Sequence, residues 1–427
     1  MPDSDAPRPP GFSPFRLPAF RYLFTGRVTS HMGNQMQAVA VGWQIYDLTG
    51  SALNLGLIGL VQFLSPLCLT LIAGQVADRY DRRVVVRCCY AVEITASCGL
   101  LLLSSLPQPP LIAFYLLLLM NGAARTFEGP CLQSLLPAVV PRDMLGRAIA
   151  VNSSALRMGQ LAGPSLGGLL YGLGPAAVYL CVISLLLTAA TALFLMPKPA
   201  TAAVRRKVTW NSVLAGLAFI RATPAVLGAM SLDLTATLFG GATVLLPIFA
   251  RDILAIGPQG LGLLRSTPAL GGLAAAILLS RYPIRAHGGK VMFAGVVVYG
   301  IATILFGLSH SLALSLPLLL VLGFGDMFST VMRQTLIQVN TPDEVRGRVA
   351  GVNMMFVGTA SQLGGFESGL AAYFLGTVGS VVFGGAAVLL VVALWMRRFP
   401  ALRTVDDPSV PVASGGQGPP APASIPT

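Results

Sequence analysis

Long apolar segments alternate with short polar segments along almost the whole chain. A helix needs about 20 mainly apolar residues to cross the hydrocarbon layer of a membrane, which is about 30 Å thick. Twelve segments meet this requirement, so the pattern predicts an all-α polytopic membrane protein. They are residues 20–46, 52–77, 84–106, 111–140, 144–171, 176–196, 225–250, 262–280, 291–308, 312–338, 345–375 and 378–396. A count of eleven stays open, because Pro268, Gly271 and Gly272 interrupt the eighth segment.

The composition supports a membrane protein. Hydrophobic residues make up 54% of the 427 residues and charged residues 10%, whereas soluble proteins usually carry about 25% charged residues. So few charges cannot cover a soluble surface, which excludes secreted disulfide scaffolds and disordered regulators. The net charge of +12 lies mostly in the short loops between apolar segments. We therefore expect a lipid bilayer around the chain and no nucleic-acid partner.

Lysine and arginine follow the alternation of the segments. Cytoplasmic loops of membrane proteins accumulate these residues. The two terminal segments and every second loop hold most of the 28 lysines and arginines, whereas the intervening loops hold Arg251 alone. Both termini are therefore expected in the cytoplasm, with the first span acting as an uncleaved targeting signal. The expected location is the bacterial inner (plasma) membrane.

The two halves of the chain resemble each other at an offset of 201 residues. The stretch Q-S-L-L-P-A-V-V-P-R-D-M-L-G-R-A-I-A-V-N from Gln133 matches Q-T-L-I-Q-V-N-T-P-D-E-V-R-G-R-V-A-G-V-N from Gln334. Chance apolar similarity does not explain a Pro–acid–x–x–Gly–Arg loop in register. We therefore expect two six-helix halves with a substrate site near the midplane between them. The expected parts are an N-terminal arm (1–19), a first bundle (20–196), a cytoplasmic linker (197–224), a second bundle (225–398) and a disordered tail (399–427).

The loop after the second segment carries a motif. Residues 74–83 read G-Q-V-A-D-R-Y-D-R-R, which resembles the G-x-x-x-D-R-x-G-R-R/K signature of the major facilitator superfamily. The resemblance implies a conformational latch made of Gly74, Asp78, Arg79, Asp81, Arg82 and Arg83. A glycine lets two helices approach closely, and an aspartate can hold a basic residue or a helix N-terminus in one conformation. The alternative is a merely solvated cytoplasmic loop.

Three features of the sequence point to one branch of that superfamily. Asp81 stands where the general pattern has glycine. Residues 43–51 read W-Q-I-Y-D-L-T-G-S, and residues 121–130 read N-G-A-A-R-T-F-E-G-P. All three features look like bacterial siderophore exporters of the enterobactin-efflux type, the transmembrane secretion effector branch. The resemblance implies a transporter and a small-molecule substrate.

The fifth segment carries a second motif. Residues 159–168 read G-Q-L-A-G-P-S-L-G-G, which is similar to the G-x-x-x-G-P-x-x-G-G motif of antiporters in the superfamily. Its residues are Gly159, Gly163, Pro164, Gly167 and Gly168. Small residues let helix backbones approach closely, and a proline creates a bend point. The resemblance favours export, and the alternative is simple tight packing.

Charged residues within the apolar segments are candidates for substrate binding and proton coupling. A charge at the centre of a bilayer costs at least about 2.5–3.5 kcal/mol and therefore marks a functional hypothesis. Arg125 and Glu128 share one face of the fourth segment, and the offset superposes Arg125 on Asp326 of the tenth. We expect these three to form a cluster that exchanges a proton for substrate; the alternative is a structural salt bridge. Further candidates are His31, Asp233 and Arg333, whereas Glu93 in the third segment has no evident partner.

Other chemistries are not supported by motifs. The chain has no G-x-x-x-x-G-K-S/T, H-E-x-x-H, C-x-x-C or G-x-S-x-G pattern, and it has three histidines and six cysteines without framework spacing. We therefore expect no cofactor, no metal site and no enzyme activity. The sequence favours a proton-coupled exporter of a small amphipathic organic compound, such as a siderophore or drug, that works by alternating access. Uptake, lipid flipping and, more remotely, a polytopic membrane enzyme, a receptor or a scaffold remain alternatives.

Overall fold

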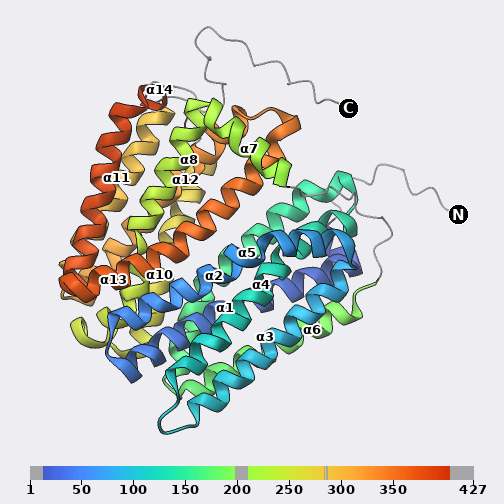
Figure 1. Ribbon diagram of the computed structural model, residues 1–427, viewed down its shortest axis with the longest axis vertical. Coiled ribbons are helices and arrows are strands. Elements are labelled where there is room, and N and C mark those ends of the chain that lie inside the picture. Colours follow the sequence, from blue (N-terminus) through green and yellow to red (C-terminus); the bar gives the residue numbers. More distant parts are fainter. Residues whose placement is uncertain (1–12, 198–209, 283, 285–286, 404–427) are drawn as a thin grey trace, which may run out of the picture.

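The computed structural model describes residues 13–197, 210–282, 284 and 287–403. Most of the expected N-terminal arm, the first part of the expected linker and most of the expected tail lie outside these residues. The described residues are helical and are joined by short turns (Figure 1). Nine of the described helices are long and apolar enough to cross a membrane. The chain is therefore an all-helical, multi-pass membrane protein.

The N-terminal half of the chain forms six long helices that follow a short 3-10 turn, η1 (Pro14–Arg16). Helix α1 packs against α5 and α6, α3 packs against α4 and α6, and α2 packs against α4. Gly50, at φ 58°, ends α1, because glycine adopts a left-handed conformation without strain. The bounds are α1 (Pro18–Thr49), α2 (Ala52–Arg79), α3 (Arg82–Ser104), α4 (Leu111–Val139), α5 (Arg142–Tyr171) and α6 (Pro175–Leu195).

The C-terminal half is more interrupted. Helix α12 packs against α10 and α11, and α13 packs against α8 and α11. A 3-10 turn, η2, and a π-helical turn, η3, follow α8. The bounds are α7 (Trp210–Ala222), α8 (Pro224–Phe239), η2 (Gly241–Leu245), α9 (Leu246–Ile248), η3 (Phe249–Ile253), α10 (Gly257–Arg281), α11 (Gly288–Gly307), α12 (Leu312–Val339), α13 (Asp343–Arg398) and α14 (Pro400–Arg403).

Glycines decide where the helices of the C-terminal half bend. The expected span 225–250 is not one regular helix, because regular α-helix ends at Phe239 and Gly241 then presses against the backbone of Gly364. Within α13, Gly376 has φ 75° and ψ 165° and forms a sharp turn. Helix α13 therefore consists of two helical parts, which correspond to the expected spans 345–375 and 378–396. Helix α10, in contrast, runs unbroken through Pro268.

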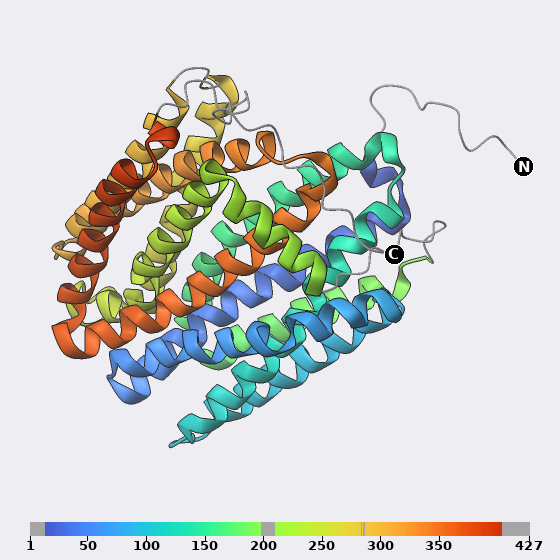
Figure 2. The ribbon, with the colours of Figure 1, turned by 45° about the horizontal axis from the view of Figure 1, so that its top comes forward.

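The two halves touch along α2 with α13 and along α5 with α10. Figures 1 and 2 show α13 crossing beside α2, with α7 lying between the C-terminal helices and the N-terminal ones. Both contacts are made where glycines meet: Gly56 faces Gly369, and Gly168 faces Gly262. Glycine removes the side chains that would otherwise hold the helices apart.

An apolar cluster closes the space between the halves at the same end of the molecule. It joins Val39, Tyr46 and Leu55 of the N-terminal half to buried residues of η2, α9, η3 and α10. All these contacts lie near the turns at Gly50, Gly174, Gly257 and Gly376. We call this end the closed end. Toward the opposite end, α7 packs on α13, where Gly216 lies against the Arg348 backbone.

Candidate functional site

Two charged residues in the middle of long helices are exposed. Arg125 lies halfway along α4 and Asp326 halfway along α12. A charge at this depth is costly in contact with lipid, so such residues face the bundle interior or a water-filled cavity. Asp326 lies within electrostatic range of Arg157 on α5, which is also exposed. These side chains therefore line a space between the two halves, which we call the central space.

The N-terminal half holds a polar cluster behind Arg125. Glu128, one turn further along α4, is 7% exposed and accepts a hydrogen bond of 3.1 Å from the Ser30 hydroxyl of α1. Arg27 lies within electrostatic range of Glu128, and His31 within range of Arg125. The Nε2 atom of His31 is buried and has no hydrogen-bond partner. The structure thus brings three of the expected residues together: Arg125, Glu128 and His31.

The C-terminal half holds a second polar cluster. The Arg333 guanidinium of α12 forms a 2.9 Å ion pair with Asp233 of α8, and both side chains are buried. Thr237 also donates to Asp233 at 3.4 Å, and Arg333 donates to Thr330 at 3.3 Å. Asp326 lies within electrostatic range of this pair. Asp326, Asp233 and Arg333 therefore group together, on the opposite side of the central space from Arg125 and Glu128.

The loop that resembles the superfamily signature is held within the N-terminal half. The Asp81 carboxylate caps α3 by accepting the Arg83 backbone N–H at 2.9 Å. The buried Arg83 guanidinium donates to the Met196 carbonyl at the end of α6, at 2.6 Å, and Arg82 donates to the Ala77 carbonyl at 3.2 Å. Gly74 and Asp78 are partly buried, and Arg79 is exposed. Arginines at a helix C-terminus satisfy carbonyls that lack partners in the helix.

The glycine-rich face of α5 is a contact surface for two helices. A Cβ atom at Gly159 would lie 3.0 Å from the His31 ring, and one at Gly163 would lie 2.6 Å from the Gln35 Cβ. Gly167 faces Met36 in the same way, so this face receives α1. Gly168 instead faces α10, and Pro164 lies inside the helix. The motif therefore places α5 against the polar face of α1 and against the C-terminal half together.

The structure adds an ion-pair network at the closed end that the sequence did not suggest. Arg251 forms a 3.2 Å ion pair with Asp47 at the end of α1 and donates to the Tyr46 carbonyl at 3.3 Å. The Tyr46 hydroxyl donates to Asp252. The sequence marked the separate residues only: Arg251 is the single cation in its set of loops, and Tyr46 and Asp47 belong to the stretch W-Q-I-Y-D-L-T-G-S. The sequence did not show that Arg251 pairs with Asp47, because the two residues lie about 200 positions apart in the chain.

Arg265 was also missed. It lies on α10 and is partly buried, on the face opposite the exposed side chains Leu263, Leu270 and Ile277. Because that exposed stripe is the lipid-facing side expected of a membrane helix, Arg265 points toward the interior. It adds positive charge near Ser266, whose hydroxyl meets that of Ser165 on α5 at 2.8 Å.

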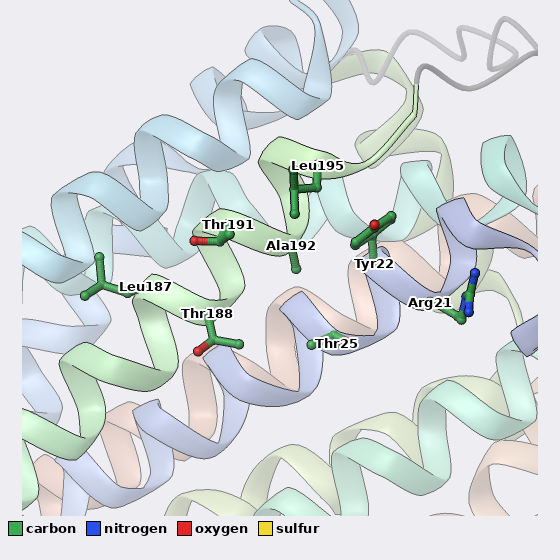
Figure 3. A pocket seen from close by; sticks show the side chains of 8 residues that line it. All are labelled: Arg21, Tyr22, Thr25, Leu187, Thr188, Thr191, Ala192 and Leu195. Atoms are coloured by element: carbon green, nitrogen blue, oxygen red, sulfur yellow. The ribbon is translucent and has the colours of Figure 1, made fainter.

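A hollow of about 570 Å³ lies elsewhere, between α1 and α6 (Figure 3). It is lined by Arg21, Tyr22, Thr25, Leu187, Thr188, Thr191, Ala192 and Leu195. It is an open depression, and Arg125, Glu128, Asp326 and the Asp233–Arg333 pair do not line it. Within the described residues, no group of three or more His, Cys, Asp or Glu side chains could hold a metal ion. The charges around the central space therefore remain the candidate site.

Comparisons with known proteins identify the family of this chain. The family model described as transmembrane secretion effector matches residues 10–414. The enterobactin exporter EntS of Escherichia coli (strain SMS-3-5) is 29% identical over 399 residues, covering 90% of this chain and 93% of that protein. The corresponding protein of Escherichia fergusonii gives the same values.

Solved structures share the fold at low identity. A bacterial homologue of the human lysosomal transporter Spinster, inward-facing and occupied, has a TM-score of 0.74 at 14% identity, covering 92% of this chain and all of that one. An inward-facing bacterial homologue of the iron transporter ferroportin has a TM-score of 0.68 at 18% identity, covering 90% and 99%. The chain therefore belongs to the transmembrane secretion effector family, a branch of the major facilitator transporters.

Proposed function

We propose that this protein exports a small amphipathic organic compound, such as a siderophore or drug, in exchange for protons. The support is the family, the similarity to an enterobactin exporter and the charged central space. It resides in a bacterial inner membrane with both termini in the cytoplasm. Two six-helix bundles (20–196 and 225–398) cross the membrane twelve times, joined by a cytoplasmic linker (197–224) and flanked by an N-terminal arm (1–19) and a tail (399–427).

One observation carries this proposal. Arg125 and Asp326 are exposed at the middle of helices from different halves, with opposite charge at positions related by the internal repeat. A substrate between them meets a cationic wall on one side and an anionic wall on the other. Such a site selects a molecule that has polar groups at its two ends. The apolar part of the molecule, between those groups, packs against the surrounding helices. Glu128 and Asp326 are the acids through which a proton competes with substrate.

Transport proceeds by alternating access of the central space. The closed end carries the turns expected outside the cytoplasm, so the molecule has its central space directed to the cytoplasm. Opening the other way requires that the contacts of α5 with α10 and of α2 with α13 separate. The loop of Gly74, Asp78, Arg79, Asp81, Arg82 and Arg83 then latches the cytoplasmic side, and the α5 motif transmits the movement of α1 to the C-terminal half.

Inside-out vesicles with an acidic interior and a pH-sensitive dye test the proposal. Catecholate and hydroxamate siderophores and cationic drugs are added in turn. A compound that releases protons from wild-type vesicles, and fails to do so from Arg125→Ala vesicles, identifies the substrate class. Arg281→Ala, which removes an exposed cation at the end of α10, is the matched control and behaves as wild type. Arg125→Ala that inserts normally and exports at the wild-type rate contradicts the proposed site, and substrate movement without proton release contradicts antiport.

A further inference from the structure

Two carboxyl groups from neighbouring helices meet inside the N-terminal half. Glu93 of α3 is 0% exposed and Glu128 of α4 is 7% exposed. The Glu128 side chain lies within hydrogen-bonding and electrostatic range of Glu93. Two carboxylates this close repel each other unless one of them carries a proton, which then bridges the pair.

Few hydrogen bonds reach this carboxyl pair, and the Tyr90 hydroxyl also lies within hydrogen-bonding range of Glu128. Ser30 and Asn34 lie one turn apart on α1 and each serve one acid: Ser30 donates to Glu128 at 3.1 Å, and Asn34 donates to Glu93 at 3.4 Å. The Oε1 atom of Glu93 is buried and has no hydrogen-bond partner. An ionised carboxylate accepts about four hydrogen bonds and is costly to bury without them. Glu93 therefore has the surroundings of a neutral acid.

Two arginines lie near the pair: Arg27 is within electrostatic range of Glu128, and Arg125 is within electrostatic range of Glu93. Neither Arg27 nor Arg125 forms an ion pair with Glu93 or Glu128 within the described part of the chain. Arg125 is exposed. The titratable and charged groups around the pair are Arg27 and His31 on α1, Cys89 and Tyr90 on α3, and Arg125 and Cys131 on α4.

We propose that Glu93 and Glu128 share one proton in this state, and that this is the proton released when substrate binds. The proposal rests on the proposed export function and gives it a specific proton site. Glu128 lies one turn along α4 from the exposed Arg125, so a substrate in the central space reaches Glu128 before Glu93. A hydroxyl, catechol or amine of the substrate that donates to Glu128 stabilises a second negative charge, and the shared proton leaves.

The first test does not require transport. Infrared spectra of the purified full-length protein in detergent at neutral pH contain the carbonyl stretching band of protonated carboxyl groups. Glu93→Gln, which closely matches the shape of the neutral acid, is expected to fold and to lose part of this band. Glu367→Gln removes a partly buried acid of α13 and leaves that part unchanged. An equal band in wild type and Glu93→Gln overturns the shared proton.

The second test measures coupling in the vesicles described above. Proton release evoked by substrate is expected in wild type and lost in Glu93→Gln, whereas Glu93→Gln still exchanges substrate down its gradient. Glu93→Asp, which keeps an acid at this position, recovers part of the release. Wild-type proton release in Glu93→Gln overturns the coupling role of the pair. Absence of proton release in wild type contradicts the antiport function itself. The infrared test of the shared proton is independent of that function.

Discussion

Gly168 of α5 and Gly262 of α10 are in backbone contact across the two halves. A Cβ atom placed on Gly168 would lie 2.8 Å from the Cα of Gly262, closer than real Cβ atoms approach. The internal repeat places Gly369 at the position equivalent to Gly168, and Gly369 meets Gly56 of α2 in the same manner. The closed end is therefore held by two glycine contacts, each with one member at the position shared by Gly168 and Gly369 in the duplication.

Gly168→Val is expected to force α5 and α10 apart. Overpacking of a close contact costs about 1–3 kcal/mol, and about 1.4 kcal/mol changes an equilibrium tenfold. The protein should therefore populate the state in which the closed end is open. Spin labels at Leu173 and Tyr373, both exposed near this end, report the change as a longer distance. Gly358→Val is the control, since nothing lies within 4 Å of a Cβ at Gly358. An unchanged distance in Gly168→Val contradicts the role of this contact.

The Asp47–Arg251 ion pair is expected to bias the same equilibrium more weakly. Its side chains are 53% and 38% exposed, and an exposed pair contributes about 0.2–1 kcal/mol. Asp47→Arg should open the closed end slightly, and Asp47→Arg with Arg251→Asp should restore it. The same spin labels measure this change, and the difference between the variants should shrink at high salt, which screens exposed charges. If the spin-label distance in the double variant is no closer to the wild-type distance than in either single variant, the Asp47–Arg251 pair does not stabilise the closed end.

The Asp233–Arg333 pair is expected to stabilise the C-terminal half. Removing one partner of a buried pair costs about 3–5 kcal/mol, because the other charge is left buried without compensation. Asp233→Ala should therefore lower the unfolding temperature in detergent, and Asp233→Ala with Arg333→Met should recover most of the loss. A double variant as unstable as Asp233→Ala indicates that packing, and not charge, holds α8 against α12.

Arg83 and Asp78 belong to one motif, but we expect Arg83 to affect stability and Asp78 to affect transport. Arg83→Ala removes a buried charged donor from the Met196 carbonyl, and such a hydrogen bond contributes about 1.5–3 kcal/mol. Thermal unfolding should detect this loss. Asp78→Asn should slow transport in vesicles, because the latch proposed for Asp78 acts in the other conformation. Normal turnover in Asp78→Asn rules out the latch.

The sequence predicted the helical fold because apolar segments of membrane length are unambiguous. It did not predict the helix breaks equally well. Pro268 and Gly271 suggested an interruption, yet α10 continues through them because Gly323 and the Leu320 backbone of α12 pack against these positions. The irregular turns after Phe239 depend on the close approach of Gly241 to α13. In both cases the packing of a neighbouring helix determines whether the helix continues or breaks, and the local sequence does not show this packing.

The sequence indicated which charged residues belong to the candidate site, but it did not indicate which of them contact one another. Charges within apolar segments identified Arg125, Glu128, Asp326 and Arg333. Glu93 had no evident partner in the sequence, because its hydrogen-bond donor Asn34 lies 59 residues away and its neighbour Glu128 belongs to another helix. Likewise, Asp47 and Arg251 come together only after both halves have folded and docked.

The glycine contacts also affect the entropy of the transport cycle. A gate made of long side chains loses rotamer freedom each time it closes, up to about 1.5–2 kcal/mol for each lysine, arginine or methionine. Gly56, Gly168, Gly262 and Gly369 have no rotamers to lose. At these four positions the closed end can therefore form and separate with little entropic cost from side chains. The direction of the cycle is then left to substrate binding and to the proton exchange proposed above.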